Sequence, residues 1–187
     1  SLLKIYEKSW RTNTMAIKHD NIIFIGVISK LGGVESFAYY MAKKYRHLDI
    51  CVLCKSGDPI QLERIRRFCP AYVHRGEDIY CKKMIINCDT TILPYVKEGE
   101  VDMVIHADYS QPCYKIYPDW HNPRIHKVYG ITQHICNIMK EHFNVDCELC
   151  YNPLVVEKKQ KRITIVSATR LSKIKRWLAN ESTRRTT

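Results

Sequence analysis

Long hydrophobic runs are missing from this sequence of 187 residues. The apolar stretch 22–28 is far shorter than the roughly 20 residues that cross a bilayer as a helix. The amino terminus also lacks a charged segment followed by an apolar stretch and a small-residue cleavage site. These absences exclude a helical membrane span and predict no secretion signal. We therefore expect a cytoplasmic protein.

The glycine patterns of two large nucleotide-binding classes are also missing. The chain has no GxGxxG fingerprint, which disfavours a nicotinamide-dependent oxidoreductase, and no glycine-rich loop ending in Gly-Lys-Ser/Thr, which excludes a P-loop NTPase. No internal repeat or low-complexity segment appears. No RNA- or DNA-binding motif is visible, so nucleic acid is not an expected partner.

The cysteines lack the pattern of a disulfide framework, because there are nine of them and they are scattered. Cys51/Cys54 and Cys147/Cys150 have the spacing of a zinc site, but about 93 residues separate the pairs, more than a zinc ribbon allows. Each pair also lies in a strand-like run, where positions three apart face opposite sides. We expect buried thiols in a reducing compartment and no metal.

Charge is abundant but uneven. The formal net charge is +11, and residues 157–187 contain ten Lys and Arg against two Glu, a balance of +8, so residues 1–156 carry only +3. Such a tail is typical of a solvated segment or of one that binds an anionic partner. The basic balance would suit an anionic membrane surface, which makes peripheral binding at the inner membrane face a further expectation.

Short apolar runs alternate with helical patterns along most of the chain, which predicts an α/β fold with an open, mostly parallel, Rossmann-like sheet and flanking helices. We expect strands at 22–28, 49–54, 71–74, 83–88, 101–106, 125–131 and 147–151, and helices at 34–45, 60–68 and 133–143. Residues 111–123 read as a loop. The expected domains are an extension (1–20), the Rossmann-like domain (21–156), and a linker with the first strand of a second domain, 163–168, in a basic tail (157–187).

Ligands of open α/β sheets bind at the carboxyl ends of the strands. Gly32 and Gly33 lie between the first strand and the first helix, with Glu35 in the first turn. Paired glycines let the backbone approach a ligand, and the helix N-terminus offers free N–H groups to phosphate. The same glycines also fit a plain turn.

Three further residues follow predicted strands. His106 ends the strand 101–106 and could contact a sugar hydroxyl or a phosphate, or transfer a proton, although a hydrogen-bonded structural role is the alternative. Asp108 follows two residues later. Thr132 either caps the next helix or presents its hydroxyl to a cleft.

Arg170 and Lys175 follow the predicted strand 163–168. Arginine binds phosphate oxygens in bidentate fashion and lysine adds a point charge. Together they could neutralise a diphosphate leaving group, although the segment can equally be a basic stretch without such a role.

Taken in order, these segments resemble the retaining glycosyltransferases of family 4, which have the GT-B architecture. The resemblance covers about residues 21–175 and rests on five motifs: Gly-Gly-Val-Glu, Asp-Met-Val-Ile-His, Tyr-Gly-Ile-Thr-Gln-His-Ile, Tyr-Asn-Pro-Leu and Ser-Ala-Thr-Arg-Leu-Ser-Lys-Ile-Lys. The sequence departs from the family pattern at Arg176, where glycine is usual, and at His106, which is not part of a His-x-His pair.

The resemblance implies an N-terminal acceptor domain of an enzyme that transfers a sugar from a nucleotide-sugar donor to a glycan or lipid-linked acceptor in polysaccharide biosynthesis. Gly32, Gly33, Arg170 and Lys175 would bind the donor diphosphate, His106 would be catalytic, and Glu35, Asp108 and Thr132 would line the cleft. No cofactor or metal is implied. The nucleoside pocket of the family lies in its second domain, so we expect this chain alone to be weakly active or inactive. The alternative function is a non-catalytic module that binds anionic ligands through its basic tail.

Overall fold

A computed structural model describes residues 16–30, 32–114 and 117–153. The predictions for residues 1–15, the linker, the strand 163–168, Arg170 and Lys175 lie outside these ranges. The described elements follow in the order β1 (Ile17–Lys18), β2 (Asn21–Ile28), α2 (Gly33–Lys44), β3 (Ile50–Gly57), α3 (Pro59–Arg66), β4 (Ala71–Val73), β5 (Ile79–Asn87), the 3-10 helix η1 (Thr90–Tyr95), β6 (Val96–Ile105), β7 (Ile125–Gly130), α4 (Gln133–Phe143) and β8 (Glu148–Leu149).

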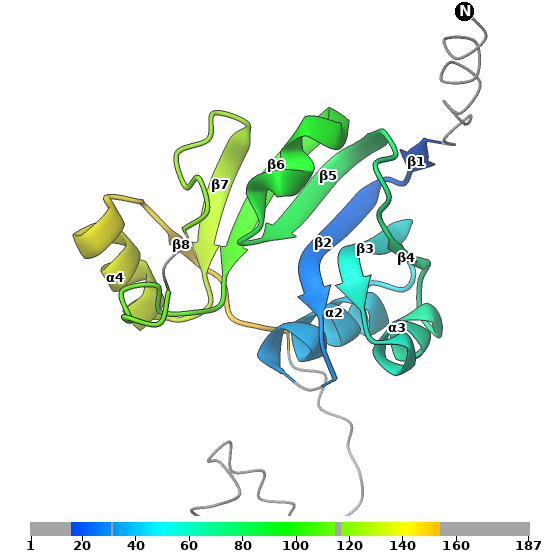
Figure 1. The fold of residues 1–187 in the computed structure, drawn as a ribbon, viewed down its shortest axis with the longest axis horizontal. Coiled ribbons are helices and arrows are strands. Elements are labelled where there is room, and N and C mark those ends of the chain that lie inside the picture. The colour runs from blue at the N-terminus through cyan, green and yellow to red at the C-terminus, as the bar shows by residue number, and fades with distance from the viewer. Residues whose placement is uncertain (1–15, 31, 115–116, 154–187) are drawn as a thin grey trace, which may run out of the picture. The chain divides into compact units, whose positions relative to one another are not determined.

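The strands form one open sheet in the order β4-β3-β2-β5-β6-β7-β8, with β1 paired to β5 outside this path (Figure 1). Every described strand pairing is parallel. The predicted α/β class and Rossmann-like architecture are therefore confirmed. From β2 the chain moves outward through β3 to β4, then crosses to β5 and continues outward to β8. The direction thus reverses between β2 and β5, and a crevice at such a switch point is where α/β sheets bind ligands.

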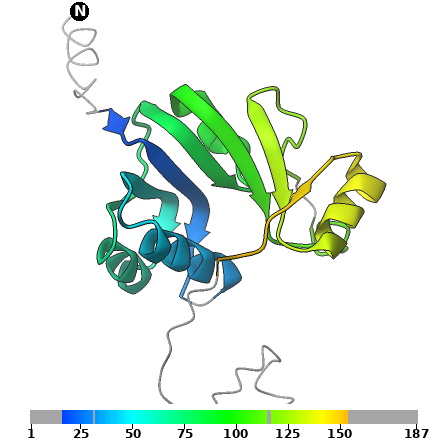
Figure 2. The same cartoon turned by 180° about the vertical axis from the view of Figure 1, so that it is seen from behind.

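Two hydrophobic clusters cover the two faces of the sheet. On one face, side chains of β2 and β3 pack against Phe37, Ala38 and Ala42 of α2 and against Leu62 and Ile65 of α3. These two helices lie together in front of the sheet when the molecule is seen from behind (Figure 2). On the other face, side chains of β2, β5 and β6 pack against η1 and α4 through residues that include Ile92, Leu93, Ile135 and Met139. Strands β2 and β3 are thus buried between two layers.

Local sequence signals explain where the helices begin and end. Asp58 caps α3 by accepting hydrogen bonds from the N–H groups of Ile60 and Gln61, and proline occupies the first turn, where its missing N–H costs nothing. Helix α4 ends at Asn144, whose φ of 52° is the left-handed conformation common after a helix. None of the described helices is long and apolar enough to cross a membrane.

Several boundaries differ from the prediction. Strand β6 starts at Val96, five residues before the expected start, because Gly99 bends the strand without ending it: its φ is +126°, which glycine adopts without strain. Strand β5 starts at Ile79, since its first residues pair with β1 and β6. The expected strand 147–151 is reduced to Glu148–Leu149, and neither β1 nor η1 was expected. The short strands β1 and β8 depend on pairing with β5 and β7.

Candidate functional site

The side chain of Glu35 bridges the turn that follows β2. Its carboxylate accepts hydrogen bonds from the N–H of Ser29 at 2.7 Å and from the hydroxyl of Ser29 at 2.6 Å. A Cβ at Gly32 would lie 2.2 Å from the other carboxylate oxygen, whereas one at Gly33 would meet nothing within 4 Å. Burial works to raise the pKa of Glu35, but the hydrogen bonds from Ser29 hold it below the ordinary value. The absence of a side chain at Gly32 therefore leaves space for the Glu35 carboxylate. A ligand could approach the N-terminal end of α2 from the side of Gly33.

A small pocket of about 70 Å³ lies beside this turn, between the first turns of α2 and α3. Arg64 lies over the ring of Tyr39, with its guanidinium carbon 4.7 Å from the ring centroid. The amide of Gln61 donates to the carbonyl oxygen of Lys30 at 2.6 Å, which joins the turn to α3. The pocket is lined by Lys30, Gly32, Glu35, Ser36, Tyr39, Tyr40, Gln61 and Arg64. Its two cations could hold a small anionic group.

His106 was predicted as the last residue of a strand; it follows the end of β6 directly and contacts α2. Its ring packs edge-on against Phe37, with the centroids 4.7 Å apart. Its Nε2 atom is buried and has no hydrogen-bond partner among the described residues. Burial lowers the pKa of His106 to about 4, so the imidazole is neutral near pH 7. A neutral ring suits a hydrogen bond to a hydroxyl better than the neutralisation of a phosphate.

A second buried acceptor follows β8. The Oδ1 atom of Asn152 is buried without a hydrogen-bond partner in the described part of the chain. The segment after β8 runs along the carboxyl edge of the sheet towards α2 in both views (Figures 1 and 2). Unpaired buried polar atoms are costly, so each calls for an explanation such as a ligand or an ordered water.

Asp108 and Thr132 stabilise local backbone. The carboxylate of Asp108 accepts hydrogen bonds from the N–H and hydroxyl of Ser110 and from the amide of Gln111, the last two at 2.6 Å. The hydroxyl of Thr132 accepts from the N–H of Ile135 at 3.2 Å and caps α4. The capping role predicted for Thr132 is confirmed.

The structure thus brings two of the predicted groups together at α2. Gly32, Gly33 and Glu35 form its N-terminal end, and His106 packs against Phe37 one turn further on. Asp108 and Thr132 follow β6 and β7, which lie beyond β5 in the sheet. The cations at 170 and 175 lie outside the described residues, so their convergence on the glycine turn stays a prediction.

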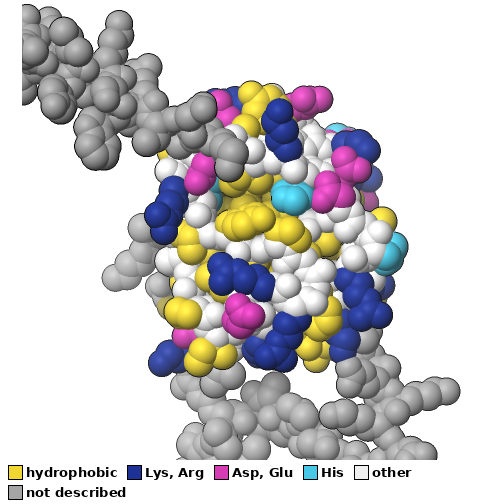
Figure 3. All heavy atoms as spheres, turned by 90° about the vertical axis from the view of Figure 1, so that its right-hand side faces the viewer, with side chains coloured by type: hydrophobic (Ala, Val, Ile, Leu, Met, Phe, Trp, Pro, Cys, Tyr) yellow, Lys and Arg dark blue, Asp and Glu magenta, His cyan; other side chains and the backbone are white. Residues whose placement is uncertain are grey.

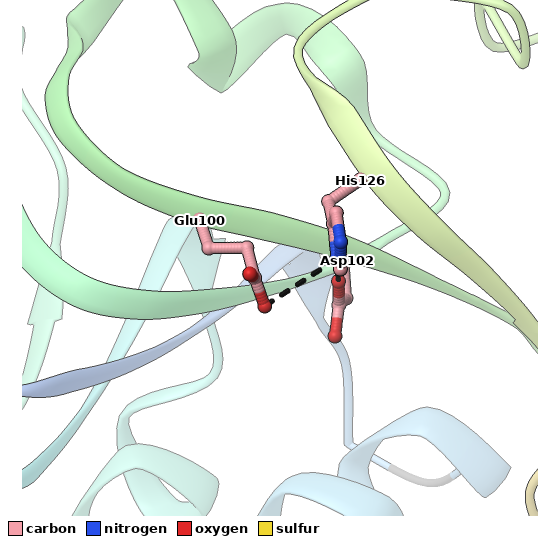
Figure 4. Close-up of side chains that lie close together, drawn as sticks. All are labelled: Glu100, Asp102 and His126. Carbon is pink, nitrogen blue, oxygen red and sulfur yellow. Dashed lines mark hydrogen bonds and ion pairs between the residues drawn. The ribbon is translucent and has the colours of Figure 1, made fainter.

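One group of side chains was missed by the sequence analysis. Glu100 and Asp102 of β6 and His126 of β7 point towards one another on one face of the sheet, with their potential ligand atoms all within 4.8 Å (Figure 4). Lys83 of β5 joins them, with its Nζ atom 2.8 Å from a carboxylate oxygen of each acid. The two carboxylates raise the pKa of Lys83. The sequence Glu-Val-Asp could have indicated this group, because residues two apart in a strand face the same side. The strand had, however, been expected to begin after Glu100.

The cysteines of the first CxxC pair face opposite sides of the sheet, as predicted. Cys51 packs in the cluster on the η1 side and Cys54 in the cluster on the α2 side. All nine cysteines are free thiols. Burial raises the pKa of Cys54, Cys69 and Cys81 to about 11 in each case. Thiols with such pKa values are poor nucleophiles at neutral pH.

A second hollow lies on the side where β4 forms the sheet edge, where hydrophobic side chains gather around a histidine (Figure 3). It has a volume of about 360 Å³ and is lined by Lys55, His74, Arg75, Gly76, Thr91, Ile92 and Tyr95. Both cations have acidic neighbours: Lys55 pairs with Asp89 at 2.7 Å, and Arg75 lies near Glu77. We assign no ligand to this hollow.

No protein-family model, curated protein or solved structure matches this chain.

Proposed function

We propose that this chain is the acceptor-side domain of a GT-B glycosyltransferase, which transfers a sugar from a nucleotide-sugar donor to a glycan or lipid-linked acceptor. The observation that carries the proposal is the buried Nε2 of His106 at the carboxyl edge, next to the helix that follows the glycine turn. This atom has no hydrogen-bond partner in the part of the chain that the structure describes. A neutral imidazole in that position matches a sugar hydroxyl. The resemblance of the sequence motifs to family 4 also implies that His106 lies in the catalytic cleft.

The turn after β2 constrains how a donor diphosphate would approach. Glu35 already occupies the inner side, and its charge would repel phosphate there. The outer side at Gly33 is open, and Lys30 and Arg64 line the adjacent pocket. We therefore propose that the diphosphate contacts the Gly33 side of the turn. Arg170 and Lys175 are proposed to contribute the remaining positive charge.

Ligand titration followed by NMR of the ¹⁵N-labelled chain tests this proposal. A panel of oligosaccharides should shift the amide signals of His106 and Phe37, and UDP or GDP should shift that of Gly33. His106→Asn removes the imidazole and should weaken saccharide binding about three- to ten-fold, the value of one hydrogen bond. Incubation with nucleotide sugars and lipid-linked acceptors, followed by mass spectrometry, measures transfer itself.

The matched control is His47→Asn. His47 is exposed and lies before β3, so it lies at the amino edge of the sheet, whereas His106 lies at the carboxyl edge. It should bind saccharides as the unmodified chain does. Saccharide-induced shifts that are equal in both variants would remove His106 from the acceptor site. Absence of any response to saccharides and nucleoside diphosphates at millimolar concentration would reject the glycosyltransferase assignment.

The alternative is a non-catalytic module that binds anionic ligands through residues 157–187. The observation in its favour is their charge balance of +8. This function predicts binding that depends on the tail and on salt, with no part played by His106.

A further inference from the structure

The distances around His126 are compatible with metal ligands. Its Nδ1 atom lies 3.4 Å from a carboxylate oxygen of Glu100 and 3.4 Å from one of Asp102. Hydrogen bonds between imidazole and carboxylate are usually about 2.7–2.9 Å long when charge assists them. In a tetrahedral site with bonds of about 2.1 Å, neighbouring ligand atoms lie about 3.4 Å apart. The imidazole makes one long hydrogen bond, to Asp102 at 3.4 Å, and lies at the same distance from Glu100. Ligands around a central ion also have this spacing.

Two backbone irregularities create this arrangement. The pairing of β6 with β7 shifts register between Val101 and Asp102, so that His126 and Lys127 stand opposite a single residue, Asp102. The pairing of β5 with β6 is also irregular, and Gly99, with φ +126°, immediately precedes Glu100. Bulges redirect side chains and are frequent next to functional sites. The cluster thus results from two local departures from regular pairing.

Charge and exposure also fit a cation site that is open on one side. The Asp102 side chain is only 2% exposed, whereas those of Glu100 and His126 are 43% and 50% exposed. Two carboxylates and one lysine leave a net charge of −1 when the imidazole is neutral. Lys127, the next cation, is paired with Glu148 at 2.7 Å. Water can therefore complete the coordination of an ion from the solvent side.

We propose that Glu100, Asp102 and His126 form a binding site for a divalent first-row transition ion. Imidazole favours Zn²⁺ and its neighbours in the series, while carboxylates favour harder ions such as Mn²⁺. Three protein ligands with remaining positions for water are typical of sites that are open to substrate. Lys83 competes for the carboxylates: the ion displaces its Nζ from Glu100, and the lysine keeps its contact with the second oxygen of Asp102. This site is independent of the proposed glycosyltransferase function.

Titration of the ¹⁵N-labelled full chain with Mn²⁺ tests the site, because this paramagnetic ion broadens nearby amide signals and has little affinity for the nine thiols. Signals of Glu100, Asp102 and His126 should broaden first. His126→Gln should weaken Mn²⁺ binding at least about ten-fold, as loss of a ligand does. Lys83→Gln should bind Mn²⁺ as tightly as the unmodified chain or more tightly, because the competing ammonium is gone.

The matched control is Glu98→Gln, which removes an exposed carboxylate from the same strand but not from the cluster. It should leave the affinity unchanged. His126 is half exposed, so its replacement should leave the fold intact, and an unchanged spectrum verifies this. Broadening that is equal in the unmodified chain and in His126→Gln, or no broadening of these residues at millimolar Mn²⁺, overturns the proposal and leaves Lys83 as the only cation of the cluster.

Discussion

Glu35 is buried and His106 is partly buried, and both lie at α2, but their polar atoms have different surroundings. Glu35 lies in the first turn of α2 and has its charge satisfied by Ser29. His106 packs against the second turn of α2 and stays neutral near pH 7 because burial lowers its pKa. Its Nε2 has no hydrogen-bond partner among the described residues. An anion that is satisfied internally stabilises the fold, whereas an unpaired imidazole is available to a ligand. The two residues were both predicted as site residues, but their surroundings support different roles.

Glu35→Gln should lower the free energy of unfolding at pH 7 by about 1–3 kcal/mol, because hydrogen bonds to a charged group are lost. The folded-state pKa of Glu35 lies below its ordinary value of 4.5. Its stabilisation is therefore complete above pH 4.5 and is lost as the pH falls through the folded-state pKa. Urea unfolding at several pH values should show the difference between the two proteins shrinking in acid.

Glu63→Gln serves as the control, since Glu63 is 67% exposed and lies 3.9 Å from Arg66. An exposed pair of this kind contributes little. If the difference in the free energy of unfolding between the unmodified chain and Glu35→Gln stays constant down to pH 3, the role assigned to the Glu35 charge is contradicted.

At the scale of elements, the glycines of the chain differ in whether, and why, their position requires the absence of a side chain. Gly99 has a positive φ, and a Cβ there would lie 2.6 Å from Sγ and 2.7 Å from the carbonyl oxygen of Cys81. Gly32 makes room for the Glu35 carboxylate, while a Cβ at Gly33 would project into open space. The bulge in β6 therefore depends on its glycine, and the start of α2 does not depend on Gly33.

Gly99→Ala should destabilise the protein by about 1–3 kcal/mol through backbone strain. Gly33→Ala should change stability by less than about 0.5 kcal/mol, because the new methyl group meets no neighbour. Denaturant unfolding of the two variants measures both values. Equal stability of the two variants would show that β6 does not need the left-handed residue.

At the scale of the whole molecule, the described members of both hydrophobic clusters all lie within residues 16–153, whereas most of the net charge lies in residues 157–187. The described hydrophobic clusters and most of the net charge thus belong to separate stretches of the sequence. This separation makes it possible to test the tail-binding alternative without disturbing the sheet.

Removal of residues 157–187 lowers the formal net charge from +11 to +3. The shortened chain should keep its cooperative melting transition, measured by circular dichroism, because it retains both clusters. Its binding to vesicles rich in phosphatidylserine should fall at least about ten-fold, since each basic residue near such a surface contributes about 1 kcal/mol. Co-sedimentation at low and high salt measures this loss. Vesicle binding that survives the truncation would place the anion site in the folded domain, with Lys30 and Arg64 as the first candidates.

Much of the fold could be predicted because a buried parallel strand and an amphipathic helix leave strong local patterns. The apolar runs at β2, β3, β6 and β7 located the sheet, and the helical spacing of apolar residues in 133–143 located α4. The early start of β6 was missed, because a glycine at position 99 is typical of the end of a strand. The cluster of Glu100, Asp102 and His126 was missed for the same reason, and because residues from two strands form it.

The sequence by itself determined the class of fold, the parallel sheet and the position of His106 at the end of a strand, because periodicity and caps act over a few neighbouring residues. Only the tertiary structure decided that Glu35 occupies the glycine turn, that Nε2 of His106 is buried without a partner among residues 16–30, 32–114 and 117–153, and that His126 lies 3.4 Å from two carboxylates. These features depend on strand register and on burial. Both are set by contacts between segments that lie far apart in the chain, so no local pattern encodes them.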